Sequence, residues 1–151
     1  MESSDYTQRT LDLFANRLNP AYPGTSGVVL QSYLYRTQND IDQMNRMGAR
    51  VRLCKGAYKE PQAVAYPDKK DVDANYVRLL DHALRAPRTD AVRIGVASHN
   101  LFHVALAVLL GRARGVSRAL DVEMLQGMAP GEARAVRDEV AGDAGRVVLY
   151  T

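Results

Sequence analysis

The sequence predicts an α/β fold that forms part of a (β/α)8 barrel. Short apolar runs alternate with segments of helical periodicity, in the order of one helix, four strand–helix pairs and a final strand, which implies a parallel sheet. No G-x-G-x-x-G motif opens any helix, and this argues against a dinucleotide-binding doubly wound fold. Polar side chains follow successive strands, as they do around the ligand site of a barrel: Gln31, Arg52, Lys55, Ser98, His99, Glu123 and Gln126.

Five strands cannot close such a barrel, and a complete one usually needs about 250 residues. We therefore expect the 151-residue chain to form one incomplete barrel domain over residues 1–151. Its hydrophobic content of 46% and charged content of 25% are ordinary for a globular domain with a single core.

The first predicted element is a helix over residues 5–18. Asp5 or Thr7 caps it, and apolar or aromatic residues recur at helical spacing as far as Leu18. Asn19-Pro20 and Pro23-Gly24 end this helix and make a loop. Residues 27–34 are mostly apolar and form the first predicted strand.

The second helix is expected over residues 38–47, where apolar side chains repeat in three-residue steps and Gly48 stops the helix. The second strand covers residues 50–58, and a long loop over residues 59–70 follows it. Loops of this length often carry function.

The remaining elements alternate in the same way. Pro87 ends the third strand–helix unit, Gly115 ends the fourth, and Pro130 stands in the first turn of the last helix. The predicted helices are residues 72–86, 102–114 and 130–141, and the predicted strands are residues 91–99, 118–126 and 146–150.

Charge and cysteine usage exclude several classes of protein. The net charge of +3 is mild and the basic residues are scattered, so we expect no nucleic-acid partner. The single cysteine, Cys54, cannot form an internal disulfide and fits a reducing compartment. The chain has no run of about 18 apolar residues and no secretory signal pattern, so we expect a cytoplasmic protein without a spanning helix.

The stretch RVRLCKGAYKEP, residues 50–61, is the strongest candidate for chemistry. Arg52 supplies a permanent planar cation, and Gly56 lets the backbone approach a bulky ligand. From the residues alone, an ion pair explains Arg52 as well as a ligand does. Lys55 is either a solvated strand-end charge or a Schiff-base lysine of the kind that barrel aldolases use.

The other candidates have structural explanations beside functional ones. His99 is either a structural histidine or a ligand-binding one, and Cys54 is expected to be a small core residue. His82 and His103 lie on predicted helices and are expected at the surface. Core packing is the simplest expectation for Tyr33, Tyr35, Leu125 and Met128. No His, Cys and Asp cluster has metal-ligand spacing, so no metal site is expected.

Five segments occur together in a recognisable order and spacing: LQSYLYRT (residues 30–37), RLCKGAYKEP (52–61), AYPDKKDVDANY (65–76), SHN (98–100) and EMLQGM (123–128). Together they resemble the monofunctional bacterial proline dehydrogenases over nearly the whole chain. The resemblance implies a distorted (β/α)8 barrel, of which this chain supplies about strands 4 to 8. It also implies FAD as cofactor and oxidation of L-proline to 1-pyrroline-5-carboxylate. Electrons then pass to a quinone, which implies peripheral contact with the inner face of the membrane.

The resemblance also assigns roles to single residues. Arg52 matches the arginine beside flavin N5, where a fixed cation favours the anionic reduced flavin and makes Arg52 the catalytic candidate. Gln31 matches a glutamine that hydrogen-bonds the isoalloxazine ring. The other implied FAD contacts are Lys55, Gly56, Ala57, Ser98 and His99. The implied wall of the proline pocket consists of Tyr58, Leu125 and Tyr150.

The chain departs from the family pattern at both ends. An acidic residue that follows the third strand of the family falls just before Met1, and a lysine of the first strand has no match. Two adjacent arginines of a final helix, which clamp the proline carboxylate, have no match after Tyr150. Asn100 stands where an Asp is usual, and Glu123-Met124 replaces a Glu-Phe-Gln pattern.

These departures leave an alternative open. The chain is then a truncated, catalytically inactive remnant that binds FAD weakly or not at all, with Met1 as a misassigned start or the edge of a broken gene. Unpaired strand edges in such a piece favour aggregation or homo-oligomers.

Overall fold

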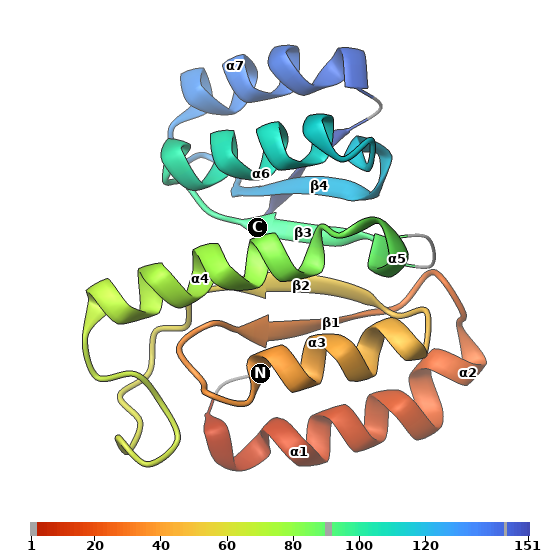
Figure 1. Ribbon diagram of the computed structural model, residues 1–151, viewed down its shortest axis with the longest axis vertical. Helices are drawn as coiled ribbons and strands as arrows, with labels where there is room; N and C mark the ends of the chain where they lie inside the picture. Colours follow the sequence, from red (N-terminus) through yellow and green to blue (C-terminus); the bar gives the residue numbers. More distant parts are fainter. Residues whose placement is uncertain (1–2, 90–91, 144) are drawn as a thin grey trace.

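Five parallel strands lie side by side in chain order. They are β1 (Gly27–Gln31), β2 (Arg50–Cys54), β3 (Ile94–Ala97), β4 (Leu120–Leu125) and β5 (Arg146–Tyr150). The computed structural model describes residues 3–89, 92–143 and 145–151. Figure 1 shows β1, β2 and β3 as successive arrows that point the same way. The predicted alternation of helices with parallel strands is confirmed.

The helices pack on one face of the sheet. From α3 onward they connect successive strands, whereas α1 and α2 precede β1. In Figure 1, α3, α4 and α6 lie in front of the strands. The α-helices are α1 (Ser4–Leu13), α2 (Asn19–Ala21), α3 (Thr37–Arg46), α4 (Lys69–Ala83), α5 (Ala86–Thr89), α6 (Leu101–Ala113) and α7 (Pro130–Val140). A π-helical stretch η1 (Phe14–Leu18) joins α1 to α2, and the 3₁₀ turns η2 (Ser117–Ala119) and η3 (Ala141–Asp143) precede β4 and β5.

The two faces of the sheet differ in polarity. Every second residue of β4 is apolar and belongs to the core shared with the helices, whereas Asp121 and Glu123 alternate with them and face the other side. In β2, Arg50 and Arg52 alternate with core residues in the same way. The sheet therefore presents a charged face opposite its helix-covered face, as the wall of a barrel presents its interior.

Tyr76 of α4 ties the helical layer to the ends of two strands. Its ring is fully buried in the core, and its hydroxyl lies 3.2 Å from the carbonyl oxygen of Leu53 and 3.3 Å from that of Ala97. Because these carbonyls stand at the carboxyl ends of β2 and β3, the hydrogen bonding fixes the edge from which the following loops leave.

The loop between β2 and α4 folds back on the segment after β1. Leu34 and Ala65 form an isolated antiparallel bridge, and the Tyr66 amide donates to the Tyr33 carbonyl at 2.8 Å. Tyr33, Leu34 and Ala65 form a small buried cluster of their own. The long predicted loop is therefore anchored close to the strand ends.

The first helical run, from α1 through η1 to α2, begins earlier and ends later than the helix predicted over residues 5–18. Ser3 occupies the N-cap position, so Asp5 and Thr7 lie inside α1, where the Thr7 hydroxyl bonds the Ser3 carbonyl at 3.4 Å. Asn19 and Pro20 do not end the helix but open α2, because proline is tolerated in a first turn. The predicted stop at Asn19-Pro20 is wrong, whereas Pro23 and Gly24 lie in the turn that follows α2, as predicted.

Strand and helix ends also differ from the predicted boundaries. β1 stops at Gln31 rather than at residue 34, because the chain turns there and the Thr37 hydroxyl donates to the Gln31 carbonyl at 2.5 Å. β2 stops at Cys54 rather than at residue 58, and α4 begins at Lys69 and ends at Ala83. Pro87 lies within the short helix α5 rather than ending α4.

Two sequence predictions fall on residues that the structure leaves undescribed. Ala91, the expected start of the third strand, lies outside the described residues, as does Met1, before which the missing acidic residue of the family was expected. The described part of the third strand begins at Ile94. Within the described ranges, no helix has the length and apolar character needed to cross a bilayer.

Candidate active site

A cavity of about 460 Å³ opens at the carboxyl edge of the sheet. Its size is typical of a ligand site. Nine of the ten predicted site residues line it: Gln31, Arg52, Lys55, Gly56, Ala57, Tyr58, Ser98, His99 and Leu125. The tenth, Tyr150, lies next to this group, with its ring under the guanidinium of Arg52. The fold thus brings together side chains from the ends of all five strands and the loops that follow them.

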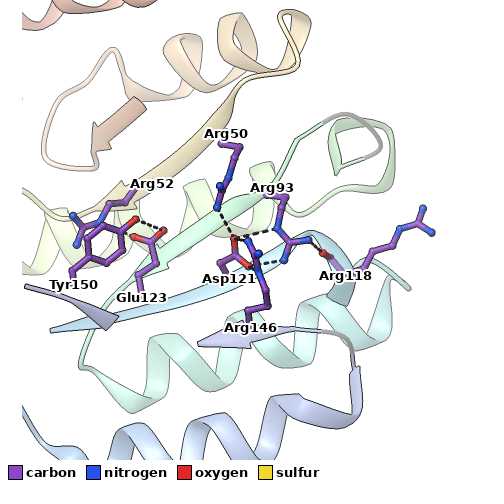
Figure 2. Close-up of polar contacts among 8 residues, drawn as sticks. All are labelled: Arg50, Arg52, Arg93, Arg118, Asp121, Glu123, Arg146 and Tyr150. Atoms are coloured by element: carbon purple, nitrogen blue, oxygen red, sulfur yellow. Dashed lines mark hydrogen bonds and ion pairs between the residues drawn. The ribbon is translucent and has the colours of Figure 1, made fainter. Parts of the chain in front are cut away.

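Arg52 is held by two groups on the charged face of the sheet. Its Nε lies 2.6 Å from Oε2 of Glu123, and its guanidinium carbon lies 4.0 Å from the centre of the Tyr150 ring. Figure 2 shows the three side chains in contact, with the Tyr150 ring against the Arg52 guanidinium. The side chain of Arg52 therefore forms an ion pair, as one of the two explanations expected, and it also lines the cavity.

Glu123 is the buried carboxylate of this group, with 5% of its surface exposed. Its Oε1 accepts a weak hydrogen bond from the Tyr150 hydroxyl at 3.5 Å. Burial raises the pKa of Glu123, while the charge of Arg52 acts in the opposite direction. Gly95 provides the space for this carboxylate, because a Cβ built there would lie 2.1 Å from Oε1.

Lys55 points toward a carboxylate that sequence reasoning did not find. Its Nζ lies 2.6 Å from Oδ1 of Asp73 on α4, and Lys69 pairs with the other oxygen of Asp73 at 2.7 Å. Hydrogen bonds from both lysines lower the pKa of Asp73 to about 2. An ion-paired ammonium offers no lone pair for attack on a carbonyl, so the geometry favours an electrostatic role for Lys55 over a Schiff base.

Gly56 is required by both backbone and packing. Its φ is +96°, and an added Cβ would lie 2.3 Å from the Tyr33 ring. The Tyr33 hydroxyl lies 3.4 Å from Glu60, whose carboxylate also accepts from the Ser4 amide at 2.8 Å. Burial, together with the nearby charge of Glu60, raises the pKa of Tyr33 to about 12. This network joins the cavity loop to the start of α1.

His99 presents a buried ring nitrogen to the cavity region. Its Nε2 accepts a hydrogen bond from the Leu125 amide at 2.8 Å, so the neutral ring carries its proton on Nδ1. Among the described residues, Nδ1 is buried and has no hydrogen-bond partner. A buried donor without a partner is costly unless a ligand or water accepts from it.

Ser98 and Asn100 have local structural roles at the start of α6. The Ser98 hydroxyl accepts from the Asn100 amide at 3.0 Å, and the Asn100 side chain caps the helix by accepting from the Phe102 amide at 3.0 Å. Asn100 therefore replaces an acidic residue without loss of the cap.

A second charged cluster lies at the opposite end of the strands and was not predicted. Asp121, with 1% of its surface exposed, pairs with Arg50 at 3.2 Å, with Arg93 at 2.5 Å and with Arg146 at 2.9 Å. Figure 2 shows the three arginines converging on this carboxylate, while the carbonyl oxygen of Arg118 accepts from Arg93. A signal was available, because an arginine opens or directly precedes three of the strands.

The cluster at Asp121 has the electrostatics of a structural site. Burial alone would raise the pKa of Asp121, but hydrogen bonds and charges from Arg146 and Arg93 outweigh it and lower the pKa to about 2. The amino ends of barrel strands serve stability more than catalysis. We therefore separate this cluster from the cavity at the carboxyl ends.

A sequence profile described as proline dehydrogenase matches residues 1–151. The chain belongs to the proline dehydrogenase family. This confirms the resemblance drawn from the five sequence segments.

Two bacterial members of the proline dehydrogenase family are similar over most of this chain. It is 36% identical over 129 residues to proline dehydrogenase 2 of Bacillus subtilis (strain 168), which covers 85% of this chain and 41% of that protein. It is 34% identical over 151 residues to the proline dehydrogenase of Deinococcus radiodurans, which covers 99% of this chain and 46% of that protein. The chain thus spans less than half the length of these curated relatives.

Solved structures support the predicted barrel architecture. Proline utilization A (PutA) of Corynebacterium freiburgense superposes with a TM-score of 0.88 at 38% identity, over 100% of this chain and 17% of that one. PutA of Bdellovibrio bacteriovorus, inactivated by N-propargylglycine, superposes with a TM-score of 0.81 at 25% identity, over 100% of this chain and 17% of that one. The predicted fold, part of a (β/α)8 barrel, is confirmed.

Several structural expectations for this proline dehydrogenase family member are wrong. His103 is buried rather than on the surface, because its ring packs 5.2 Å from that of Tyr76. His82 is partly buried and pairs with Asp42 at 2.7 Å. Tyr35, Leu125 and Met128 are exposed rather than in the core, because they lie on turns beyond the strand ends or at the cavity mouth.

The structure agrees with only part of what was expected for Cys54. It is only partly buried and lines the cavity, so it is not a core residue in the expected sense. Its Sγ lies 3.6 Å from the Leu30 carbonyl oxygen, and burial raises the pKa of the thiol. A protonated thiol is a poor nucleophile, which agrees with the expectation that Cys54 does no covalent chemistry.

Proposed function

We propose that the protein is an FAD-dependent proline dehydrogenase that oxidises L-proline to 1-pyrroline-5-carboxylate. The observation that carries the proposal is the single cavity lined by nine of the ten residues that the family resemblance assigns to flavin and proline. These residues come from four strand ends that are distant in sequence. Their convergence supports one shared site in a member of this family.

The chemistry of the cavity fits FAD. The amide of Gln31, the cations of Arg52 and Lys55, and the buried Nδ1 of His99 are donors to a ligand rich in carbonyl, ring-nitrogen and phosphate acceptors. Bound there, FAD would supply the two-electron acceptor for removal of a hydride from the substrate carbon. Gly56 lines the cavity, and its positive φ of +96° turns the chain there so that the backbone itself forms part of the cavity wall.

Charge is the main contribution that we propose for Arg52 and Lys55. Arg52 holds a permanent positive charge on β2, which stabilises negative charge that develops on a bound ring during reduction. Lys55 is fixed by Asp73 and provides a second cation toward the phosphates. Both side chains are held in place before any ligand binds, so little reorganisation is needed on binding.

Tyr58, Leu125 and Tyr150 are proposed as the wall that receives the proline ring. Tyr58 is 49% exposed and Leu125 is 43% exposed, both at the mouth of the cavity, where a bound ring would cover them. An apolar wall excludes water from the reacting carbon. Tyr150 contributes its ring next to Arg52.

The proposal extends to partners and location. A quinone is proposed to reoxidise the flavin, which would bring a cytoplasmic protein into peripheral contact with the inner face of the membrane. Among the described residues, the outer edges of β1 and β5 pair with no further strand, and such edges favour association with more chain or with a second copy.

The test is the visible absorption spectrum of the purified 151-residue chain, loaded with FAD, before and after addition of L-proline. Bleaching of the flavin by proline is the expected result. The matched variants are Arg52→Ala, which should lose bleaching, and Arg17→Ala, which removes an exposed arginine far from the cavity and should behave like the unaltered chain.

A second candidate is a flavin-binding chain without turnover, because the outer edges of β1 and β5 leave the described part of the barrel open. A flavin spectrum that proline leaves unchanged would support that remnant over the dehydrogenase. Soluble folded chain that takes up no FAD at all would overturn the flavin site itself. Circular dichroism on the same sample establishes that the chain is folded.

A further inference from the structure

We infer that Glu123 is a positioning residue that sets both the direction and the effective charge of Arg52 in the cavity. The inference rests on the proposed function, because it takes Arg52 as the cation that faces the flavin. No motif in the sequence assigns this role to Glu123.

The first support is how the pair is built across the sheet. Arg52 lies on β2 and Glu123 on β4, so β3 runs between them. The β3 residue in register with Arg52 is Gly95, and a Cβ there would lie 2.1 Å from Oε1 and 2.6 Å from Cδ of Glu123. The missing side chain lets the carboxylate cross over β3 and reach Arg52 at 2.6 Å.

The second support is that Glu123 has few alternative arrangements. Its side chain is buried, and its other oxygen faces the Tyr150 hydroxyl at 3.5 Å. Tyr150 in turn stacks on the Arg52 guanidinium at 4.0 Å. The three side chains form a closed triangle, visible in Figure 2, in which moving one member displaces the other two.

The third support is charge. A buried carboxylate in contact with a guanidinium offsets much of the positive potential of the guanidinium. The potential that Arg52 produces in the cavity is therefore smaller than that of an unpaired cation. A neutral glutamine at position 123 would keep a side chain of the same shape beside Arg52 and leave the cation uncompensated. Glu123 therefore lowers the tendency of bound flavin to accept electrons, while it holds Arg52 in place.

The test measures the midpoint potential of bound FAD in Glu123→Gln and Glu123→Ala, by equilibration with a reference dye. For Glu123→Gln we expect an approximately tenfold shift of the equilibrium toward reduced flavin, which is about 30 mV for a two-electron couple. Glu123→Ala should instead weaken FAD binding about tenfold, because Arg52 loses its support. A Glu123 with a merely structural role would leave the potential of the glutamine variant unchanged.

Matched variants separate charge from position. Gly95→Ala keeps the charge of Glu123 but displaces its carboxylate, so it should behave like Glu123→Ala in FAD binding. Glu132→Gln removes an exposed carboxylate on α7 and should leave potential and affinity unchanged. In an Arg52→Ala background, Glu123→Gln should no longer raise the potential, and a shift that persists there would overturn the inference.

A readout without flavin keeps this inference distinct from the proposed function. In the flavin-free chain, urea unfolding of Arg52→Ala, Glu123→Ala and the double variant should reveal coupling of tenfold or more in the unfolding equilibrium constant. Additive effects would overturn the positioning role. If the variants show this coupling but the unaltered chain binds no FAD, the proposed function fails. The effect of Glu123 on the flavin potential then fails with it, while the role of Glu123 in positioning Arg52 stands.

Discussion

The guanidinium carbon of Arg52, on β2, lies 4.0 Å from the centre of the Tyr150 ring on β5. The contact joins two strands that are separated in the sheet by β3 and β4. A cation over an aromatic face is stabilised by about 0.5–2 kcal/mol, more where water is excluded. Tyr150 therefore restrains the side chain that we propose to face the flavin.

Removing this ring should loosen Arg52 and weaken FAD binding. For Tyr150→Ala we expect an FAD dissociation constant about three- to tenfold higher, in line with the loss of one cation–π contact. Tyr150→Phe keeps the ring and loses only the 3.5 Å hydrogen bond to Glu123, so it should bind nearly as tightly as the unaltered chain. Fluorescence titration of FAD measures both, and equal losses would assign the effect to the hydroxyl instead.

Removing the buried carboxylate of Asp121 should lower the free energy of unfolding strongly. Asp121→Ala leaves three arginines converging on a buried space without a counter-charge, and loss of one buried partner typically costs 3–5 kcal/mol. Because these arginines are about one-third to one-half exposed, we expect the lower end, about 3 kcal/mol in urea unfolding. Asp138→Ala removes a carboxylate that is 69% exposed and should cost under about 0.5 kcal/mol. Similar values for both variants would contradict the assignment.

The lowered pKa of Asp121 also implies that the free energy of unfolding falls in acid. The pKa of Asp121 is about 2 in the folded chain and 3.8 in the reference state, so its contribution is complete above about pH 4 and is lost as the pH falls toward 2. The difference corresponds to about 2 kcal/mol. Urea unfolding between pH 7 and pH 3 should show a smaller acid loss in Asp121→Asn than in the unaltered chain. Parallel pH profiles would assign the loss in acid to other carboxylates.

Local sequence signals predicted the framework well. Gly48 and Gly115 were expected to stop helices, and both have the positive φ that glycine adopts readily, +63° and +67°. The short apolar runs located the strands correctly, although the alternation of core and charged residues in β2 and β4 became clear only in the structure. These features depend on neighbours within a few residues, and the sequence displays them directly.

Contacts that cross the fold could not be predicted from these signals. The partner of Lys55 is Asp73, one helix away, and the partner of Arg52 is Glu123, two strands away. No periodicity links such residues, because their pairing depends on strand order and on the space left by Gly95. The family resemblance located the cavity but gave no information on which carboxylates hold its cations.

Asp73 should control how firmly Lys55 is held at the cavity. In Asp73→Asn the ion pair with Lys55 is lost, and we expect FAD binding to weaken about three- to tenfold, with a smaller loss at high salt, where the ion pair is screened in the unaltered chain too. Lys69→Ala removes the other partner of Asp73 and leaves the Lys55 contact intact, so it should change binding by less than about twofold. Isothermal titration of FAD at two salt concentrations distinguishes the two variants. A larger effect from Lys69→Ala would show that Lys69, not Lys55, carries the charge.

Gly56→Ala should be damaging for two separable reasons. The φ of +96° is unfavourable for alanine by about 1 kcal/mol, and the new Cβ would lie 2.3 Å from the Tyr33 ring, which adds about 1–3 kcal/mol of overpacking. Gly24→Ala has a similar positive φ of +72° with no atom within 4 Å, so it should show the backbone cost alone. In a Tyr33→Leu background the cost of Gly56→Ala should fall toward that of Gly24→Ala. Urea unfolding measures all of these, and a Gly56→Ala cost that Tyr33→Leu does not relieve would mean that backbone strain alone fixes this glycine at the cavity wall.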